Sequence, residues 1–182
     1  MMDLLMHLRA PVVLAVILVA VGCEEKLKPS VVVVNQEQLP SHESWNSTVV
    51  FTDSARVEAV LWAGHIAVYA TEQYTLFSDS VHIDFFNDLQ QHTSTLTARR
   101  GRVDDRTKDL DAYERVRLVS DDGTVLTTDH LLWKNEDRTI RSDGFVEIVS
   151  PTERITGQGL VSDQSLKNYR IFRVTGRAVT TE

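Results

Sequence analysis

The sequence predicts an all-β fold in which an antiparallel sheet is built from repeated two-strand units. From Ser41 to Ser150 there is no proline, and no long stretch has the period of a helix. Valine and threonine, which fit well on a pleated sheet, are abundant in this region. Short runs of these residues alternate with polar turn sequences, a pattern typical of strands joined by tight connections.

The first 22 residues are expected to be a lipoprotein signal peptide. Residues 10–22 carry no charge and follow Arg9, but this run is too short for a membrane span, which needs about 20 residues. Cys23, the single cysteine, follows the small residue Gly22, and residues 19–23 resemble a bacterial lipobox. We therefore expect Cys23 to be lipidated and to hold the mature chain on a membrane. An uncleaved signal anchor and an ordinary secreted protein are the alternatives.

Residues 23–44 are expected to form a tether that leads into the sheet, and residues 45–182 to form the folded domain. Pro29 and Pro40 interrupt the tether, whereas residues 31–34 are all valine and favour a strand. Removal of the signal peptide leaves 160 of the 182 residues. That length is enough for one domain with a hydrophobic core.

The charge pattern excludes one class of partner. The net charge is −7, acidic and basic residues are interspersed, and there is no basic run or basic-aromatic patch. A nucleic-acid-binding surface is therefore not expected. The acidic balance also argues against electrostatic adhesion to anionic lipid.

Polar turn sequences mark the ends of the expected strands. In "LDAYERVRL", Leu110, Ala112, Val116 and Leu118 share one parity and therefore one face of a strand, which Glu114 interrupts. Turns are predicted at "DDRTKD" (104–109), "SDDGT" (120–124), "KNEDRT" (134–139) and "SDQS" (162–165).

An internal repeat organises the strands. Leu61, Leu96 and Leu126 each open a similar unit, and Ile155 opens a shorter fourth one, so the starts are separated by 35, 30 and 29 residues. A fixed spacing indicates stacked units that cannot bury their apolar face alone. Residues 20 positions after the first three starts match (Val81, Val116 and Val146), as do those 22 positions after them (Ile83, Leu118 and Ile148).

No constellation typical of an enzyme, a metal site or a cofactor site is visible. The six histidines form no H-x-H or H-x-x-x-H pair, and neither G-x-S-x-G nor a P-loop occurs. The pairs Asp104-Asp105 and Asp121-Asp122 lie in predicted turns, where aspartate binds backbone amides. We therefore expect no catalytic residue, no metal ligand and no cofactor. Three tryptophans are expected in the core or at its rim: Trp45, Trp62 and Trp133.

The chain resembles the LptC family, the periplasmic component of lipopolysaccharide export. The last repeat is the most specific, because a G-x-G at Gly157 and Gly159 is followed by "SD" and a tyrosine-containing strand. The resemblance covers residues 43–175. It is carried by "ESWNSTVVFTDSARVEAVLWAGHIAVY" (43–69), "HTSTLTARRGRVDDRTKDLDA" (92–112), "LTTDHLLWKNEDRTIRSDGFVEI" (126–148) and "ITGQGLVSDQSLKNYRI" (155–171).

The resemblance implies an elongated, twisted antiparallel β-jellyroll, open along one side, whose interior holds lipid acyl chains. It further implies lipopolysaccharide as cargo, an inner-membrane lipopolysaccharide ABC transporter as donor and a periplasmic bridge protein of the LptA type as acceptor. Many members of the family have an N-terminal transmembrane helix, whereas this sequence has a lipobox. We expect the anchor in the inner membrane rather than the outer one, facing the periplasm.

Apolar residues of the repeat are the candidates for the lipid groove. The alternative is that they pack a closed core in a structural or polysaccharide-associated β-solenoid lipoprotein without lipid cargo. The candidate groove residues are Leu61, Val81, Ile83, Leu96, Val103, Val116, Leu118, Leu126, Ile140, Val146 and Ile148.

The end of the chain is predicted to be a terminal edge strand, "YRIFRVTGRAV" at 169–179. Such an edge offers free N–H and C=O groups to a partner's strand. Gly157 and Gly159 either allow a close backbone approach or form a bulge or turn. A Gly157→Arg variant is expected to fold and to lose partner binding. The candidate docking residues are Gly157, Gly159, Tyr169, Ile171 and Arg173.

Overall fold

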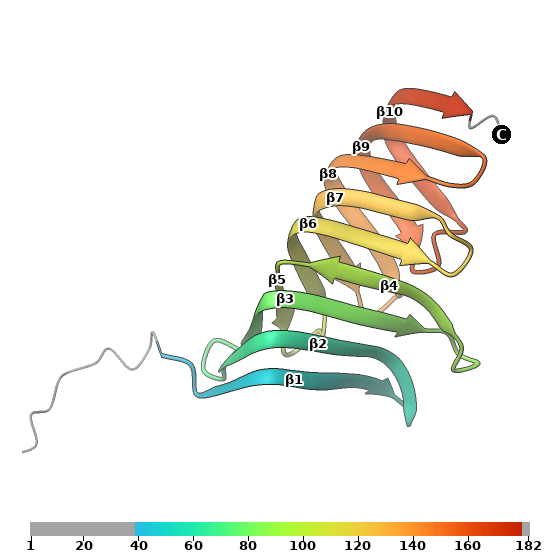
Figure 1. Cartoon of the computed structure of the whole chain (residues 1–182). Helices are drawn as coiled ribbons and strands as arrows, with labels where there is room; N and C mark the ends of the chain where they lie inside the picture. The colour runs from blue at the N-terminus through green and yellow to red at the C-terminus, as the bar shows by residue number, and fades with distance from the viewer. Residues whose placement is uncertain (1–38, 180–182) are drawn as a thin grey trace, which may run out of the picture. The chain divides into compact units, whose positions relative to one another are not determined.

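The computed structural model describes residues 39–179, which form one ten-stranded antiparallel sheet (Figure 1). The predicted all-β antiparallel fold is confirmed. Cys23 and the valine run at 31–34 lie outside the described residues. The strands are β1 (His42–Asp53), β2 (Arg56–Tyr69), β3 (Tyr74–Phe86), β4 (His92–Ala98), β5 (Arg100–Asp104), β6 (Leu110–Ser120), β7 (Val125–Lys134), β8 (Thr139–Val149), β9 (Glu153–Asp163) and β10 (Tyr169–Val179).

Strand order in the sheet follows the order of the chain. Each strand pairs with its neighbours in sequence, except that β4 and β5 together occupy the place of one strand. β4 pairs with one half of β3 and one half of β6, and β5 pairs with the other halves. Arg99 separates these two short strands, so a single strand is broken at its middle.

The other long strands also bend near their middles. The ladder shifts register between Ala63 and His65 in β2 and between Tyr113 and Val116 in β6. Glu114 and Arg115 have φ values of 62° and 55°, a left-handed conformation that is typical of a bulge. This bulge explains why Glu114 interrupts the apolar face of β6 while Val116 returns to it.

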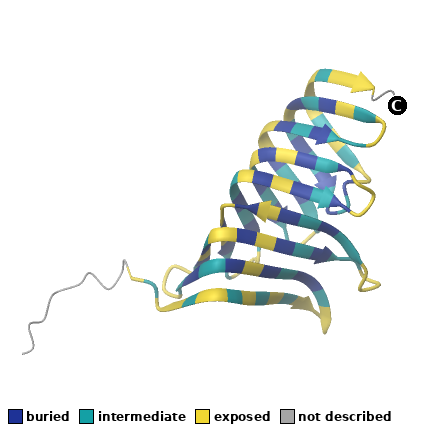
Figure 2. Ribbon diagram, in the orientation of Figure 1, coloured by how far each residue is buried: buried dark blue, intermediate teal, exposed yellow. Residues whose placement is uncertain are grey.

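The bends divide the sheet into two facing layers. We call A layer the strand halves that carry Leu61, Ile83 and Leu96, and B layer the halves that carry Val103 and Leu110. In the interior, Phe85 of the A layer packs against Trp133 of the B layer, with ring centroids 5.3 Å apart. The two layers therefore enclose one hydrophobic core, which Figure 2 shows as alternating buried and exposed bands along the strands.

The sequence repeat corresponds to one circuit through both layers. Gly64 lies in the register shift of β2 and Asp129 in that of β7, while Arg99 separates β4 from β5. Each of the three stands three residues after a leucine that opens a unit. Across the A layer the openings of successive units share one ladder of paired residues. This ladder runs Leu61–Ile83–Leu96–Leu118–Leu126–Ile148–Ile155.

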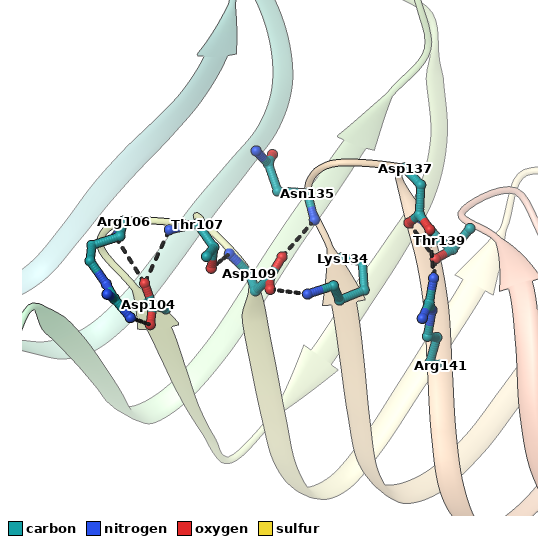
Figure 3. Close-up of polar contacts among 9 residues, drawn as sticks. All are labelled: Asp104, Arg106, Thr107, Asp109, Lys134, Asn135, Asp137, Thr139 and Arg141. Carbon is teal, nitrogen blue, oxygen red and sulfur yellow. Dashed lines mark hydrogen bonds and ion pairs between the residues drawn. The ribbon is translucent and has the colours of Figure 1, made fainter.

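All four predicted turns are present, and in each of them an aspartate accepts a backbone hydrogen bond. Asp104 accepts hydrogen bonds from the backbone N–H groups of Arg106 and Thr107, at 2.9 and 3.0 Å (Figure 3). Asp122 accepts one from Thr124 at 3.0 Å. One aspartate of each predicted pair, Asp104 and Asp122, thus has the turn-forming role that the sequence indicated.

The tryptophans occupy different environments. Trp133 is in the core, as expected, whereas Trp45 is 63% exposed on β1 and Trp62 is 37% exposed on β2. Trp45 and Trp62 therefore lie outside the core. Within residues 39–179 we find no helix long and apolar enough to cross a membrane.

Candidate functional site

The structure brings the predicted groove residues together in one interior cluster. All eleven are no more than 2% exposed. Val103 and Ile140 come from the B layer and the others from the A layer. Because these side chains already fill the space between the layers, most of the interior is sealed. Within residues 39–179, an open cavity lies at one end of it.

The opening lies opposite the bends, where the turns of the two layers face each other. We call this gap between the two rows of turns the mouth. The β7–β8 turn reaches across it through Arg138, which binds Glu58 of β2 and Asp88 of the β3–β4 turn. The β9–β10 turn reaches across it through Gln164, whose side chain donates to the carbonyl oxygen of Phe86 at 2.9 Å.

A cavity of about 690 Å³ occupies the mouth at the β1–β2 end of the sheet. Its floor is apolar and its lip is charged. The floor includes Val49, Phe51, Ile66, Val68, Phe77 and Val103, and the lip includes Asp53, Glu58, Asp105, Lys108, Glu136 and Arg138. An apolar chain with a polar end matches this arrangement, because the floor removes apolar surface from water while the lip remains hydrated.

Only Val103 of the predicted groove residues lines this cavity. The repeat pointed to the interior but not to its open end. Val49 and Phe51 belong to β1, which among the described strands pairs only with β2, and both side chains are only partly buried against the core. In the sequence, only the alternating apolar residues Val49 and Phe51, ahead of the first repeat, indicated an additional strand with an interior face.

Three charged residues, Arg138, Glu58 and Asp88, form an ion-pair cluster at one side of the cavity, which we call the clasp. Nη2 of Arg138 lies 2.6 Å from Oε1 of Glu58, and Nη1 lies 2.5 Å from Oδ1 of Asp88. The hydrogen bond from Arg138 lowers the pKa of Asp88, and the same bond raises the pKa of Arg138. Both groups are therefore held in their charged forms.

The opposite end of the mouth is closed by the β9–β10 turn. Leu166 of this turn is 2% exposed, and Asp163 accepts backbone hydrogen bonds from Ser165, Lys167 and Asn168 at 3.0 to 3.1 Å. Burial opposes ionisation of Asp163, but hydrogen bonds from Asn168 and Ser165 outweigh it and lower its pKa. The turn is thus held by its own hydrogen bonds and closes this end of the mouth.

Further hydrogen bonds connect the turns of the B layer. Oδ1 of Asp109 accepts the backbone N–H of Asn135 at 3.0 Å, and its other oxygen binds Lys134 (Figure 3). Asp137, in the β7–β8 turn, binds the side chains of Thr139 and Arg141 at the start of β8. The B-layer side of the mouth is therefore bordered by turns with their own polar supports.

The predicted docking residues lie in the last two strands. Among the described strands β10 pairs only with β9, so it is an edge strand of this sheet, as expected. Tyr169 and Ile171 pack against the core, and Arg173 donates to Oε1 of Gln158 at 3.2 Å. Other β10 side chains, Phe172, Val174 and Val179, are exposed.

The two glycines of β9 accommodate the chain's own β10. A Cβ on Gly157 would lie 2.5 Å from the carbonyl oxygen of Arg173, and Gly159 has a φ of +78°. This geometry argues against the expectation that Gly157→Arg folds normally, because even a methyl group at 157 requires the backbone of β10 to shift. These glycines permit a close backbone approach and a bend at once.

Four histidines of the described residues, His65, His82, His92 and His130, are paired with carboxylates. His65 binds Glu43, His130 binds Asp111, and His92 lies 2.7 Å from Asp121. Within residues 39–179 no group of three or more potential ligands is arranged to hold a metal ion.

The family model "LptC: Lipopolysaccharide-assembly, LptC-related" matches residues 12–177. None of the curated protein sequences compared with the chain matches it. The fold is similar to the crystal structure of LptH from Pseudomonas aeruginosa, described as the LptA-homologous periplasmic component of the conserved lipopolysaccharide transport device. The TM-score is 0.52 at 9% identity, over 68% of this chain and 94% of that one, a likeness that concerns the fold. The chain belongs to the LptC-related family of lipopolysaccharide-assembly proteins.

Proposed function

We propose that this protein carries lipopolysaccharide across part of the periplasm, accepting it from an inner-membrane ABC transporter and passing it to a bridge protein of the LptA type. One observation carries the proposal: a chain of this family has an apolar cavity that opens through a charged lip between two β layers. Acyl chains would enter the cavity, and the saccharide would remain in water.

Burial of apolar surface in the cavity can bind acyl chains without any chemical reaction. Transfer of apolar surface from water contributes roughly 25 cal/mol per Å², so several acyl chains on this floor would be bound without any covalent step. The sealed interior beyond the cavity means that deeper insertion requires the two layers to separate along the mouth. We propose that the eleven predicted groove residues line this path when the layers part.

The free edge of β10 supports a docking role. Its unpaired backbone groups and its exposed Phe172 and Val174 can extend the sheet into a partner's strand. We propose this edge, with Tyr169, Ile171 and Arg173, as the contact with the LptA-type protein. Lipidated Cys23 would hold the opposite end of the chain on the inner membrane.

A second candidate function is a structural or polysaccharide-associated lipoprotein with a closed core. The near-complete burial of the eleven interior residues favours it. The two candidates differ in whether lipid ever contacts the interior face of β1.

Photocrosslinking at two neighbouring positions separates them. Val49 packs against the core and lines the cavity, whereas Thr48 pairs with the exposed Trp62 on the outer face. With a benzophenone amino acid in place of each, we expect lipopolysaccharide adducts in cells at position 49 and few or none at position 48. Equal adducts at both positions, or none at either, would favour the closed-core protein.

A further inference from the structure

We propose that a second groove, on the outer face of the B layer, binds the saccharide part of the same lipopolysaccharide molecule; this inference rests on the proposed carrier function. The groove has a volume of about 650 Å³, within the range of ligand sites. Its lining comes from β2, β3, β5, β6 and β7. It includes His65, Tyr69, Leu76, Ser78, Arg100, Arg102, Tyr113, Glu114 and Asp129.

The groove and the mouth cavity lie on opposite faces of one wall. Side chains alternate along a strand, so Thr75 and Val103 face the cavity while Leu76 and Arg102 face outward. Tyr69 and Tyr74 pair on either side of the β2–β3 turn, at the rim of the mouth. A saccharide that leaves the cavity at this rim can therefore turn onto the outer face.

Aromatic rings and a guanidinium shape the rim end of the groove. The rings of Tyr69 and Tyr74 stack with centroids 4.8 Å apart, and the guanidinium carbon of Arg102 lies 4.6 Å from the Tyr74 centroid. Tyr113, at the other end, stacks on His130 at 4.9 Å. Rings held in this way are rigid, and their polar tips suit the hydroxyl groups of a sugar.

The charges of the groove identify the ligand as a polyol rather than an ion. Two arginines, Arg100 and Arg102, are matched by two acids, Glu114 and Asp129. Arg100 pairs with Glu114, whereas within residues 39–179 neither Arg102 nor Asp129 has an ion-pair partner. One donor and one acceptor are thus free for hydroxyl groups, and the balanced charge gives no net attraction for phosphate.

The test measures saccharide and lipid separately by calorimetry on the folded protein. The saccharide probe is a dephosphorylated core oligosaccharide of lipopolysaccharide, and the lipid probe is lipid A. Arg102→Ala and Asp129→Asn should each weaken oligosaccharide binding roughly tenfold and leave lipid A binding unchanged. Arg141→Ala is the matched control, because Arg141 lies on the same outer row, beyond Asp111 and Leu132, with its own partner Asp137.

Each other outcome overturns one of the two proposals. The groove is not a saccharide site if the oligosaccharide fails to bind, binds both groove variants normally, or is displaced by inorganic phosphate. If lipid A fails to bind while the oligosaccharide still depends on Arg102 and Asp129, the groove stands and the acyl-carrier function falls.

Discussion

Arg138 and Glu58 are 80 residues apart in the sequence, yet their side chains meet at 2.6 Å across the mouth. The pair joins the β7–β8 turn to β2, and neither residue is one of the apolar positions that match between the repeat units. Glu58 is 9% exposed and Arg138 is 28% exposed at the side chain. The contact is therefore a partly buried ion pair that also holds the two layers together.

Removal of the arginine should weaken the fold and loosen the mouth. Arg138→Met leaves a nearly buried carboxylate without its partner, and we expect the free energy of unfolding to fall by about 1–3 kcal/mol. Uptake of a fluorescent fatty acid should become faster. Arg141→Met is the control, since its partner Asp137 is 46% exposed and the loss should stay below about 1 kcal/mol. Equal effects of the two variants in urea titrations would contradict the clasp.

Stability should decline in acid. Asp163, Asp122 and Asp137 have pKa values below the ordinary 3.8. A carboxyl with a lowered folded pKa stabilises above its unfolded value, and this contribution is lost as the pH falls through the folded value. We expect the free energy of unfolding to decrease below about pH 4. Asp163→Asn should reduce this slope, and an unchanged slope would remove Asp163 from the cause.

Two glycines provide a matched test of the close approach between β9 and β10. Gly157→Ala should destabilise by about 1–3 kcal/mol, because its Cβ would meet the Arg173 carbonyl oxygen at 2.5 Å. Gly144→Ala should be nearly neutral, because its Cβ would meet only the Ser142 hydroxyl at 3.8 Å. Thermal unfolding measures both. Tolerance of alanine at 157 would show that β10 can move away without cost.

Proline substitutions test the edge of β10. Neighbouring residues of an edge strand direct their N–H groups alternately to the sheet and to the free edge. Of Phe172→Pro and Arg173→Pro, one should therefore remove a bond to β9 and lower the melting temperature. The other should keep the fold and lose the LptA-type partner in a pull-down. Full partner binding by the stable variant would place the docking edge elsewhere.

The lipid anchor is tested by Cys23→Ser. We expect no incorporation of labelled fatty acid and either release from the membrane or accumulation of the precursor. A cysteine-free chain that still incorporates label would contradict the lipobox interpretation.

The repeat made most of the fold predictable. The leucines at 61, 96 and 126 lie in one cross-strand ladder because each unit returns to the same layer after two strands. The turns were visible because aspartates bind backbone amides there. The bends were less visible: Glu114 adopts a left-handed conformation without being glycine.

The open end of the interior was not predictable from the repeat. Burial of Val116 and Ile148 is equally compatible with a filled or a hollow interior, since apolar parity is the same in both. The clasp was also hidden, because nothing local marks Glu58 and Arg138 as partners. The outer groove joins residues of five strands whose aromatic and charged side chains look like ordinary surface positions in sequence.

Strand order that follows the chain has a consequence for the order of folding. Every sheet pairing joins near neighbours in sequence, and such contacts form with little loss of loop entropy. The closures across the mouth join residues 80, 78 and 70 positions apart, at Glu58–Arg138, Phe86–Gln164 and Ser94–Gln164. We therefore expect these to form last and, in the native protein, to break first. Separation of the two rows of turns leaves every strand-to-strand hydrogen bond intact, so the molecule can open along its length while the sheet remains folded.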